Sequence, residues 1–103
     1  FVYFDPPYRP ISATSFTTYS SHKWGGDKEQ IRLAEFCKKL NEINVNILVS
    51  NSDPQQVNPE DLFFQEQYLA TQGFQIKSVD AIRAINSKGD GRGKVKELLI
   101  SNY

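Results

Sequence analysis

Four consecutive residues near the start of the chain, Asp5, Pro6, Pro7 and Tyr8, combine groups that could act together on a planar amine. Each proline restricts the residue before it to extended conformations and lacks a backbone N–H, so these residues should form a stiff bend. An amine conjugated to a ring is a weak nucleophile because its lone pair is delocalised. The Asp5 carboxylate and the Pro6 carbonyl could accept its two hydrogens and localise that lone pair. Tyr8 could stack on the face of the ring.

This chemistry does not require Asp5 to be a strong base, because an alkylated amine of this kind loses its proton easily. Positioning and electrostatics would supply most of the catalysis. The same four residues are also ordinary turn chemistry, since Pro often follows Asp where a strand ends. A purely structural turn therefore stays open as the alternative to a catalytic motif.

The elements around residues 5–8 favour a ligand site. Residues 1–4 are apolar and aromatic, which predicts a buried, parallel strand. In open α/β sheets, ligands bind beyond the carboxyl ends of the strands, and Asp5 follows such an end. Residues 9–26 show no clear period and are rich in Ser and Thr. A connection of this length is typical of a lid or a binding loop.

Two helices are expected further along the chain. Asp27 as N-cap, with Gln30 completing a capping box, begins an apolar pattern that predicts a helix over 28–42. Asn58 followed by Pro59 predicts the start of the second helix, and Gly73 is the expected stop.

Three more strands complete the pattern. An apolar run predicts a strand over 45–49, ended by turn residues at 50–54. Strands over 74–85 and 95–100, joined by a Gly-rich loop at 86–93, predict an antiparallel hairpin. The order β-α-β-α-β-β favours an α/β sheet whose first strands are parallel.

Composition sets limits on function. The chain has 103 residues, with 12 Lys+Arg, 12 Asp+Glu and a formal net charge of zero. It lacks the positive excess usual in a free-standing nucleic-acid binder, so any DNA contact must come from a local cluster or from other parts of the protein. Cys37, the only cysteine, lies on the apolar face of the first helix and should be core packing. His22 is the only histidine, so no zinc site is expected.

Other candidate sites are weaker. The Gly-rich stretch 89–94 is spaced wrongly for a phosphate loop and favours a hairpin loop. Asn51 and Asp53 follow the second predicted strand, at the same sheet edge as Asp5. They are candidates for the site, although their sequence is also common in turns.

Several segments together resemble a known family. The Asp-Pro-Pro-Tyr motif after an aromatic strand resembles the catalytic motif of amino methyltransferases, which use S-adenosylmethionine and act on adenine N6 or cytosine N4 in DNA. Other stretches resemble Dam-type (D12 class) adenine methyltransferases over nearly the whole chain: the loop at 9–10 and 14–19, the helix at 29–36, the strand end at 49–53, and the closing hairpin at 81–87 and 92–103.

The resemblance implies a fold and a set of roles. The fold would be a fragment of a Rossmann-like methyltransferase, with a mixed sheet that is mostly parallel, two helices and a C-terminal antiparallel hairpin. Asp5, Pro6 and Tyr8 would line the adenine pocket within the catalytic motif that Pro7 completes, and Asp5 would also lie near the methionine part of the cofactor. The residues expected near DNA are Tyr8, Arg9, Ser12, Ser15 and Thr17.

The sequence also departs from this family. No Gly-rich cofactor motif and no DNA-recognition region is found in residues 1–103, and there is no Met. We therefore expect an excised C-terminal half of a bacterial, cytoplasmic enzyme of restriction–modification, acting on double-stranded DNA without a metal or a membrane. Alone, the fragment should neither bind the cofactor tightly nor methylate DNA. Its exposed strand at residues 1–4 should favour self-association.

Two other classes of function stay open. One is a methyltransferase for a different planar amine, such as RNA adenine, DNA cytosine N4 or a protein glutamine side chain. The other is an interaction domain that keeps the fold without the chemistry. The absent cofactor loop favours the second class for this chain, whereas Asp5 and Tyr8 disfavour it for the whole protein.

Overall fold

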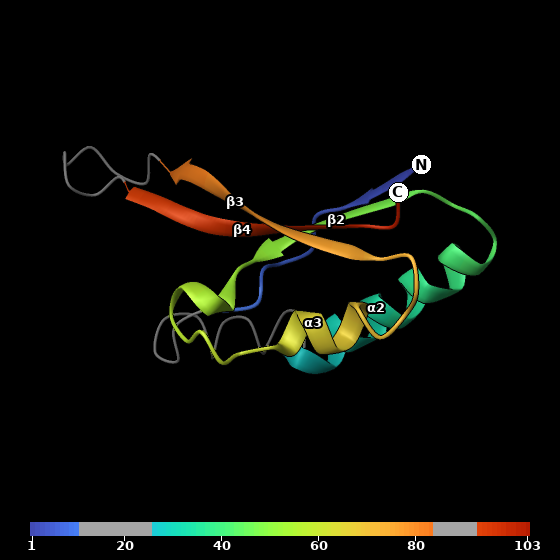
Figure 1. The fold of residues 1–103 in the computed structure, drawn as a ribbon, viewed down its shortest axis with the longest axis horizontal. Coiled ribbons are helices and arrows are strands. Elements are labelled where there is room, and N and C mark those ends of the chain that lie inside the picture. The colour runs from blue at the N-terminus through green and yellow to red at the C-terminus, as the bar shows by residue number, and fades with distance from the viewer. Residues whose placement is uncertain (11–25, 84–92) are drawn as a thin grey trace.

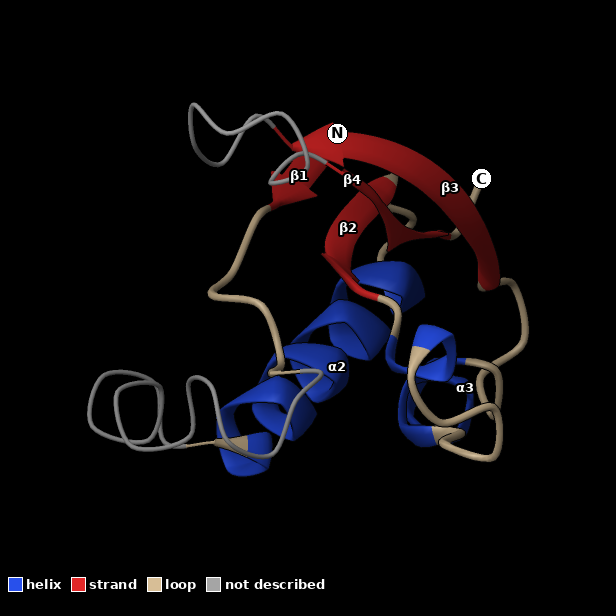
Figure 2. Ribbon diagram, turned by 90° about the vertical axis from the view of Figure 1, so that its left-hand side faces the viewer, coloured by secondary structure: helices blue, strands red, loops and turns tan. Residues whose placement is uncertain are grey.

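The computed structural model describes residues 1–10, 26–83 and 93–103. In this part of the chain, one sheet with the strand order β1-β2-β4-β3 has two helices on one of its faces (Figure 1), and Figure 2 shows the same two layers from the side. The elements are β1 (Val2–Phe4), α2 (Asp27–Glu42), β2 (Ile47–Ser52), a short 3-10 helix η1 (Pro54–Gln56), α3 (Phe63–Tyr68), β3 (Gln75–Arg83) and β4 (Gly93–Ser101). The predicted α/β class and the order of strands and helices are confirmed.

The sheet is mixed, as predicted. β1 runs parallel to β2, with Val2 opposite Ile47, whereas β4 is antiparallel to both β2 and β3. β1, β2 and β3 therefore share one direction and β4, which lies between β2 and β3, runs against them. The predicted C-terminal hairpin is formed by β3 and β4. Most of the loop predicted at 86–93 lies outside the described residues, and Gly93 is the first residue of β4.

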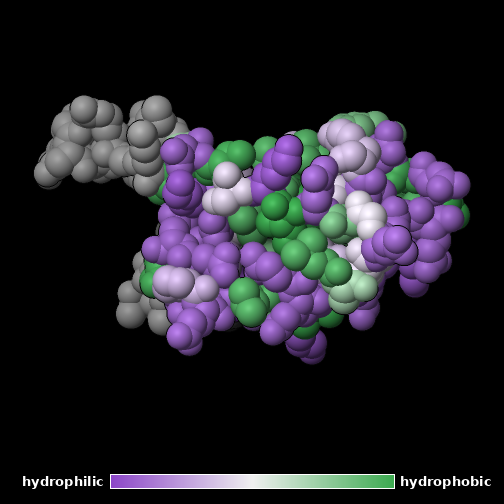
Figure 3. Space-filling view, in the orientation of Figure 1, coloured by the Kyte–Doolittle hydropathy of each residue, from purple (hydrophilic) through white to green (hydrophobic). Residues whose placement is uncertain are grey.

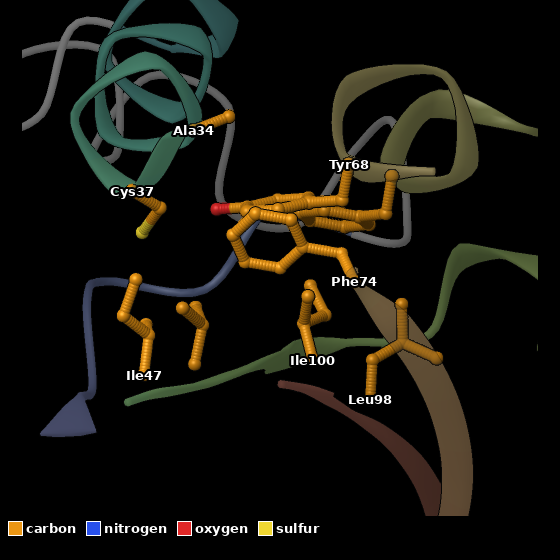
Figure 4. Packing of buried hydrophobic residues seen from close by; sticks show 9 residues of the cluster. Ala34, Cys37, Ile47, Tyr68, Phe74, Leu98 and Ile100 are labelled. Carbon is orange, nitrogen blue, oxygen red and sulfur yellow. The ribbon is translucent and has the colours of Figure 1, made fainter. Parts of the chain in front are cut away.

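The hydrophobic core lies between the sheet and the two helices. Figure 4 shows Cys37 on α2 directed towards Ile47, while the Tyr68 side chain extends from α3 towards α2, above the residues of the strands. On the face shown in Figure 3, hydrophobic residues gather at the centre, with hydrophilic residues on either side of them. The buried apolar residues are Ala34, Cys37, Ile47, Val49, Phe64, Tyr68, Phe74, Leu98 and Ile100. The predicted core role of Cys37 is confirmed, and burial raises the pKa of its thiol to about 11, which makes a thiolate unfavourable at neutral pH.

The first strand is less buried than predicted. β1 is the end strand of the sheet, and within the described residues it pairs only with β2. Val2 and Phe4 are half-buried, while Phe1 is 74% and Tyr3 is 52% exposed. Hence one face of β1 contributes to the core, and the other face and the outer edge do not.

The first helix does not begin with the predicted capping box. Gly26 is the N-cap, at a φ of 69°, and no side chain caps the helix. Asp27 is already helical, and its carboxylate binds Arg9 at a distance of 2.9 Å. Gln30 is buried and donates to the Pro7 carbonyl. Both side chains therefore connect α2 to the segment after β1.

The second strand and the second helix both begin later than predicted. β2 extends through Ser50, Asn51 and Ser52, which were expected to form a turn, because β4 pairs with all three. α3 begins at Phe63, not at Asn58. The reason is local: Asn58 Oδ1 accepts from Glu60 N in a turn, and Asp61 Oδ1 accepts from Phe63 N where the helix starts.

Candidate active site

Asp5 lies directly after the carboxyl end of β1, as the sequence predicts. Its side chain is exposed, and Oδ1 accepts a hydrogen bond from Ser50 Oγ at 3.0 Å. The same hydroxyl lies 3.0 Å from the Tyr3 hydroxyl. Ser50, on the neighbouring parallel strand, thus holds the carboxylate in one orientation. Because the residue is exposed, a ligand could reach the carboxylate.

Tyr8 is half-buried, and its hydroxyl donates to Glu97 Oε1 on β4 at 3.3 Å. Burial raises the pKa of this phenol most, and the negative charges of Glu97 and Asp5 raise it further, against a lowering effect of the Ser50 hydrogen bond. The phenol therefore stays protonated at neutral pH and remains a donor. This contact positions the ring at the edge where β1 and β2 end.

The two prolines differ in their surroundings. Pro6 is half-buried and Pro7 is exposed. The Pro7 carbonyl accepts a hydrogen bond from Gln30 Nε2 at 2.9 Å. Because neither proline can donate to the sheet, side chains take over the task of holding this segment in place.

Two buried side-chain amides extend the hydrogen-bond network that begins at the Pro7 carbonyl. Asn51 Nδ2 donates to Gln30 Oε1 at 3.0 Å, and Asn51 Oδ1 accepts from Arg9 N at 2.8 Å. Ser52 Oγ donates to the Arg9 carbonyl at 2.5 Å. The backbone on both sides of Tyr8 is therefore bound by side chains of α2 and β2.

The Arg9 guanidinium binds two carboxylates of this chain. Nε lies 2.9 Å from Asp27 Oδ1 and Nη1 lies 3.0 Å from Asp61 Oδ2, while the group stands over the Phe63 ring at 4.3 Å. Burial disfavours the charge, but the hydrogen bonds and charges of the two aspartates outweigh it, so the pKa of Arg9 is raised. The predicted DNA contact of Arg9 stays a prediction.

The other residues that the sequence suggests for the site differ in where the structure places them. Asn51 joins the site, whereas Asp53 caps η1 through Gln55 N and accepts from Ser78 Oγ at 2.6 Å. Three predicted DNA-side residues lie outside the described part of the chain: Ser12, Ser15 and Thr17.

Three residues that bind the 5–8 segment were not predicted for the site from the sequence: Ser50, Gln30 and Glu97. One signal was available for the glutamine. Gln30, Ala34 and Cys37 recur at helical spacing, so a polar side chain on the core-facing side of α2 required a polar partner.

The resemblance implies S-adenosylmethionine as cofactor, and the described residues could bind one part of it. An amino group could donate to the exposed Asp5 carboxylate. A Cβ built on Gly26 would meet nothing within 4 Å, and one on Gly73 would meet the Asn41 amide at 3.8 Å. Neither glycine shows the close approach that a nucleotide-binding glycine turn provides. The described residues therefore fit only the amino-acid end of this cofactor.

Two features are absent from the described ranges. No group of three or more His, Cys, Asp or Glu residues there could hold a metal ion. No helix within those ranges is long and apolar enough to cross a membrane.

Comparison with known proteins agrees with the motif. The family model for the D12 class N6 adenine-specific DNA methyltransferase matches residues 1–85. The chain is 47% identical to the type II methyltransferase M.MjaIII of Methanocaldococcus jannaschii over 100% of its own length and 33% of the relative's. It is 35% identical to the type II methyltransferase M1.LlaDCHI of Lactococcus lactis subsp. cremoris, with the same coverage.

A third relative is the DNA adenine methylase of Escherichia coli (strain K12), which is 37% identical over 95% of this chain and 32% of the relative. The chain thus spans about a third of the length of the curated relatives it matches. The family match covers more than half of the chain and includes the whole 5–8 segment. The chain belongs to the D12 class N6 adenine-specific DNA methyltransferase family.

Proposed function

We propose that residues 1–103 are the part of a site-specific methyltransferase that carries the catalytic motif, and that the whole protein modifies adenine N6 in double-stranded DNA. The intact protein would serve restriction–modification in a prokaryotic cytoplasm. The observation that carries this proposal is the exposed Asp5 carboxylate, which Ser50 orients at the end of β1 beside Tyr8. The family match and the type II methyltransferases among the relatives support it.

The proposed roles are those that the motif predicts. Asp5 and the Pro6 carbonyl accept the two hydrogens of the adenine amino group, and Tyr8 stacks on the base. S-adenosylmethionine, when bound, supplies a methyl group that is activated by a sulfonium. As the methyl–sulfur bond breaks and the N–C bond forms, positive charge would pass from sulfur to N6, where the Asp5 carboxylate would stabilise it until the proton is lost to water. Ser12, Ser15 and Thr17 would contact DNA, together with Tyr8 and Arg9.

The test uses the full-length protein that contains this chain. Asp5→Ala should lower methyl transfer to duplex DNA about 10²–10³-fold, the loss typical when one preorganised electrostatic group is removed. Glu35→Gln, an exposed change on α2, is the matched control and should keep full activity. Mass spectrometry of the product must then find N6-methyladenine.

Other products would decide for the alternatives. Methyl label on cytosine N4, on RNA adenine or on protein glutamine would replace the proposed substrate. If no substrate is labelled by the full-length protein, a non-catalytic interaction domain becomes the better explanation.

We further propose that the chain alone is inactive and associates with a second copy through β1. Its outer edge has no strand partner within the described residues, and Tyr3 is 52% exposed beside it. Unpaired edges favour pairing with another chain. Light scattering of the isolated chain should show a dimer or larger species, and Tyr3→Lys, which adds a charge beside the edge, should shift it towards the monomer. A monomeric unmodified chain, or turnover by the chain alone, would contradict these two statements.

A further inference from the structure

Two amide side chains are buried next to the 5–8 segment. Gln30 is 3% exposed on the core-facing side of α2, and Asn51 is 0% exposed near the carboxyl end of β2. Burial of an amide is unfavourable unless its donors and acceptors are paired, and an apolar side chain would fill the same space without that requirement. The presence of two such amides side by side therefore calls for an explanation beyond packing.

Their hydrogen bonds converge on the backbone around Tyr8. Gln30 Nε2 donates to the Pro7 carbonyl at 2.9 Å, and Asn51 Oδ1 accepts from Arg9 N at 2.8 Å. The two amides also bind each other at 3.0 Å, which fixes the direction of both side chains. The residues before and after Tyr8 are thus tied to α2 and β2 by one continuous set of contacts.

The prolines explain why side chains do this work. Pro6 and Pro7 have no N–H, so the 5–8 segment cannot be extended as a hydrogen-bonded strand. Ser50 fixes the Asp5 carboxylate and Glu97 fixes the Tyr8 hydroxyl, but neither contacts the backbone between them. The two amides hold the main chain on either side of the ring, and Ser52 Oγ adds a hydrogen bond to the Arg9 carbonyl.

We propose that Gln30 and Asn51 are positioning residues that fix the Tyr8 ring and the neighbouring backbone relative to the Asp5 carboxylate. The inference rests on the proposed methyltransferase function, because its consequence is a loss of methyl transfer. Neither residue touches the base. Their removal should therefore lower kcat while the KM for S-adenosylmethionine stays within about twofold.

The sharpest test in the full-length protein is Gln30→Glu. A protonated glutamic acid has the shape of glutamine and can still donate to the Pro7 carbonyl, whereas the carboxylate cannot. Burial would raise the pKa of this new carboxyl towards neutrality. The charged group nearest to this segment, the Arg9 guanidinium, is already paired with Asp27 and Asp61.

The Gln30→Glu variant should match the unmodified enzyme at about pH 6 and fall at least about tenfold below it by about pH 9, as the carboxyl ionises. Gln30→Ala should be slow at every pH. Gln72→Glu introduces the same group at an exposed position and should follow the unmodified enzyme throughout. Circular dichroism at each pH corrects kcat for the folded fraction. A folded Gln30→Glu enzyme with the unmodified profile would overturn the proposal.

A second measurement is independent of activity. Amide hydrogen exchange of Arg9 should accelerate at least about tenfold in Asn51→Leu, which removes its acceptor. Unchanged exchange would also overturn the proposed positioning. The unmodified protein could fail to methylate any substrate while the amide exchange of Arg9 still responds as expected. In that case the proposed function fails and the placement of the backbone stands.

Discussion

Helix α2 and strand β2 each contribute residues to an apolar region and to a polar region. On α2, Cys37 points into the hydrophobic core whereas Gln30, two turns earlier, binds the segment after β1. On β2, Ile47 and Val49 belong to the core, and Asn51 on the same face of the strand joins the polar region. The contacts change from apolar to polar towards the N-terminus of α2 and towards the carboxyl end of β2.

This difference indicates that the apolar region mainly stabilises the fold and that the polar region mainly orients the candidate catalytic residues. Apolar contacts are non-directional, so the core fixes the distance between helices and sheet but tolerates small rotations. Amide hydrogen bonds weaken when their angles change, so the polar region fixes orientation. The candidate catalytic residues lie at the polar end, where orientation matters most.

The largest expected effect is on the core. Phe64→Ala should lower the free energy of unfolding by about 3–5 kcal/mol, because a fully buried ring leaves a cavity. Denaturant titration of the full-length protein measures the loss. The kcat of the fraction that remains folded should change little. A large fall in that kcat would show that the two regions are not separate.

Asn51→Leu should have a smaller effect on stability, about 1–3 kcal/mol, because Arg9 N and Gln30 Oε1 lose their buried partner while the volume is kept. Here kcat should fall by more than the unfolded fraction explains. Ile47→Val, a small change on the same strand face, is the control. Equal kcat values for the two variants would argue against a special polar region.

The pH dependence of the core gives the next test. The thiol pKa of Cys37 is raised to about 11, whereas in the unfolded chain it stays near its ordinary value of 9.0. This contribution to stability is complete below about pH 9 and is lost as the pH rises towards 11, at about 1.4 kcal/mol per pH unit. Cys37→Ala should remove that part of the slope in urea titrations. An unchanged slope would place the thiol in contact with solvent.

Tyr8→Phe should have the smallest effect on stability. It deletes the hydrogen bond to Glu97 but keeps the ring, so the expected loss is about 0.5–1.5 kcal/mol. Stacking should survive, and the KM for DNA should remain similar. Tyr8→Ala, which removes the ring as well, should weaken methyl transfer much more. If both variants behave alike, the hydroxyl and not the ring is the important group.

Much of the fold was accessible from the sequence, because its strongest signals were local. The apolar runs predicted β1 and the hairpin, and Asp5 was correctly placed at a strand end. The polar run 50–52 was misread as a turn because its strand conformation depends on pairing with β4, which is distant in sequence. Gln30 was assigned to a cap for a related reason: its partners, Pro7 and Asn51, come together only in the folded chain.

One contact has a consequence for how this protein can vary. The ion pair between Arg9 and Asp27 joins the two residues that flank positions 10–26, so both ends of that stretch are anchored to the body of the fold. Lengthening such a stretch adds only about 0.6 kcal/mol of closure entropy for each doubling. Insertions or exchanged segments could therefore diversify this stretch while the neighbouring Asp5 carboxylate keeps its place.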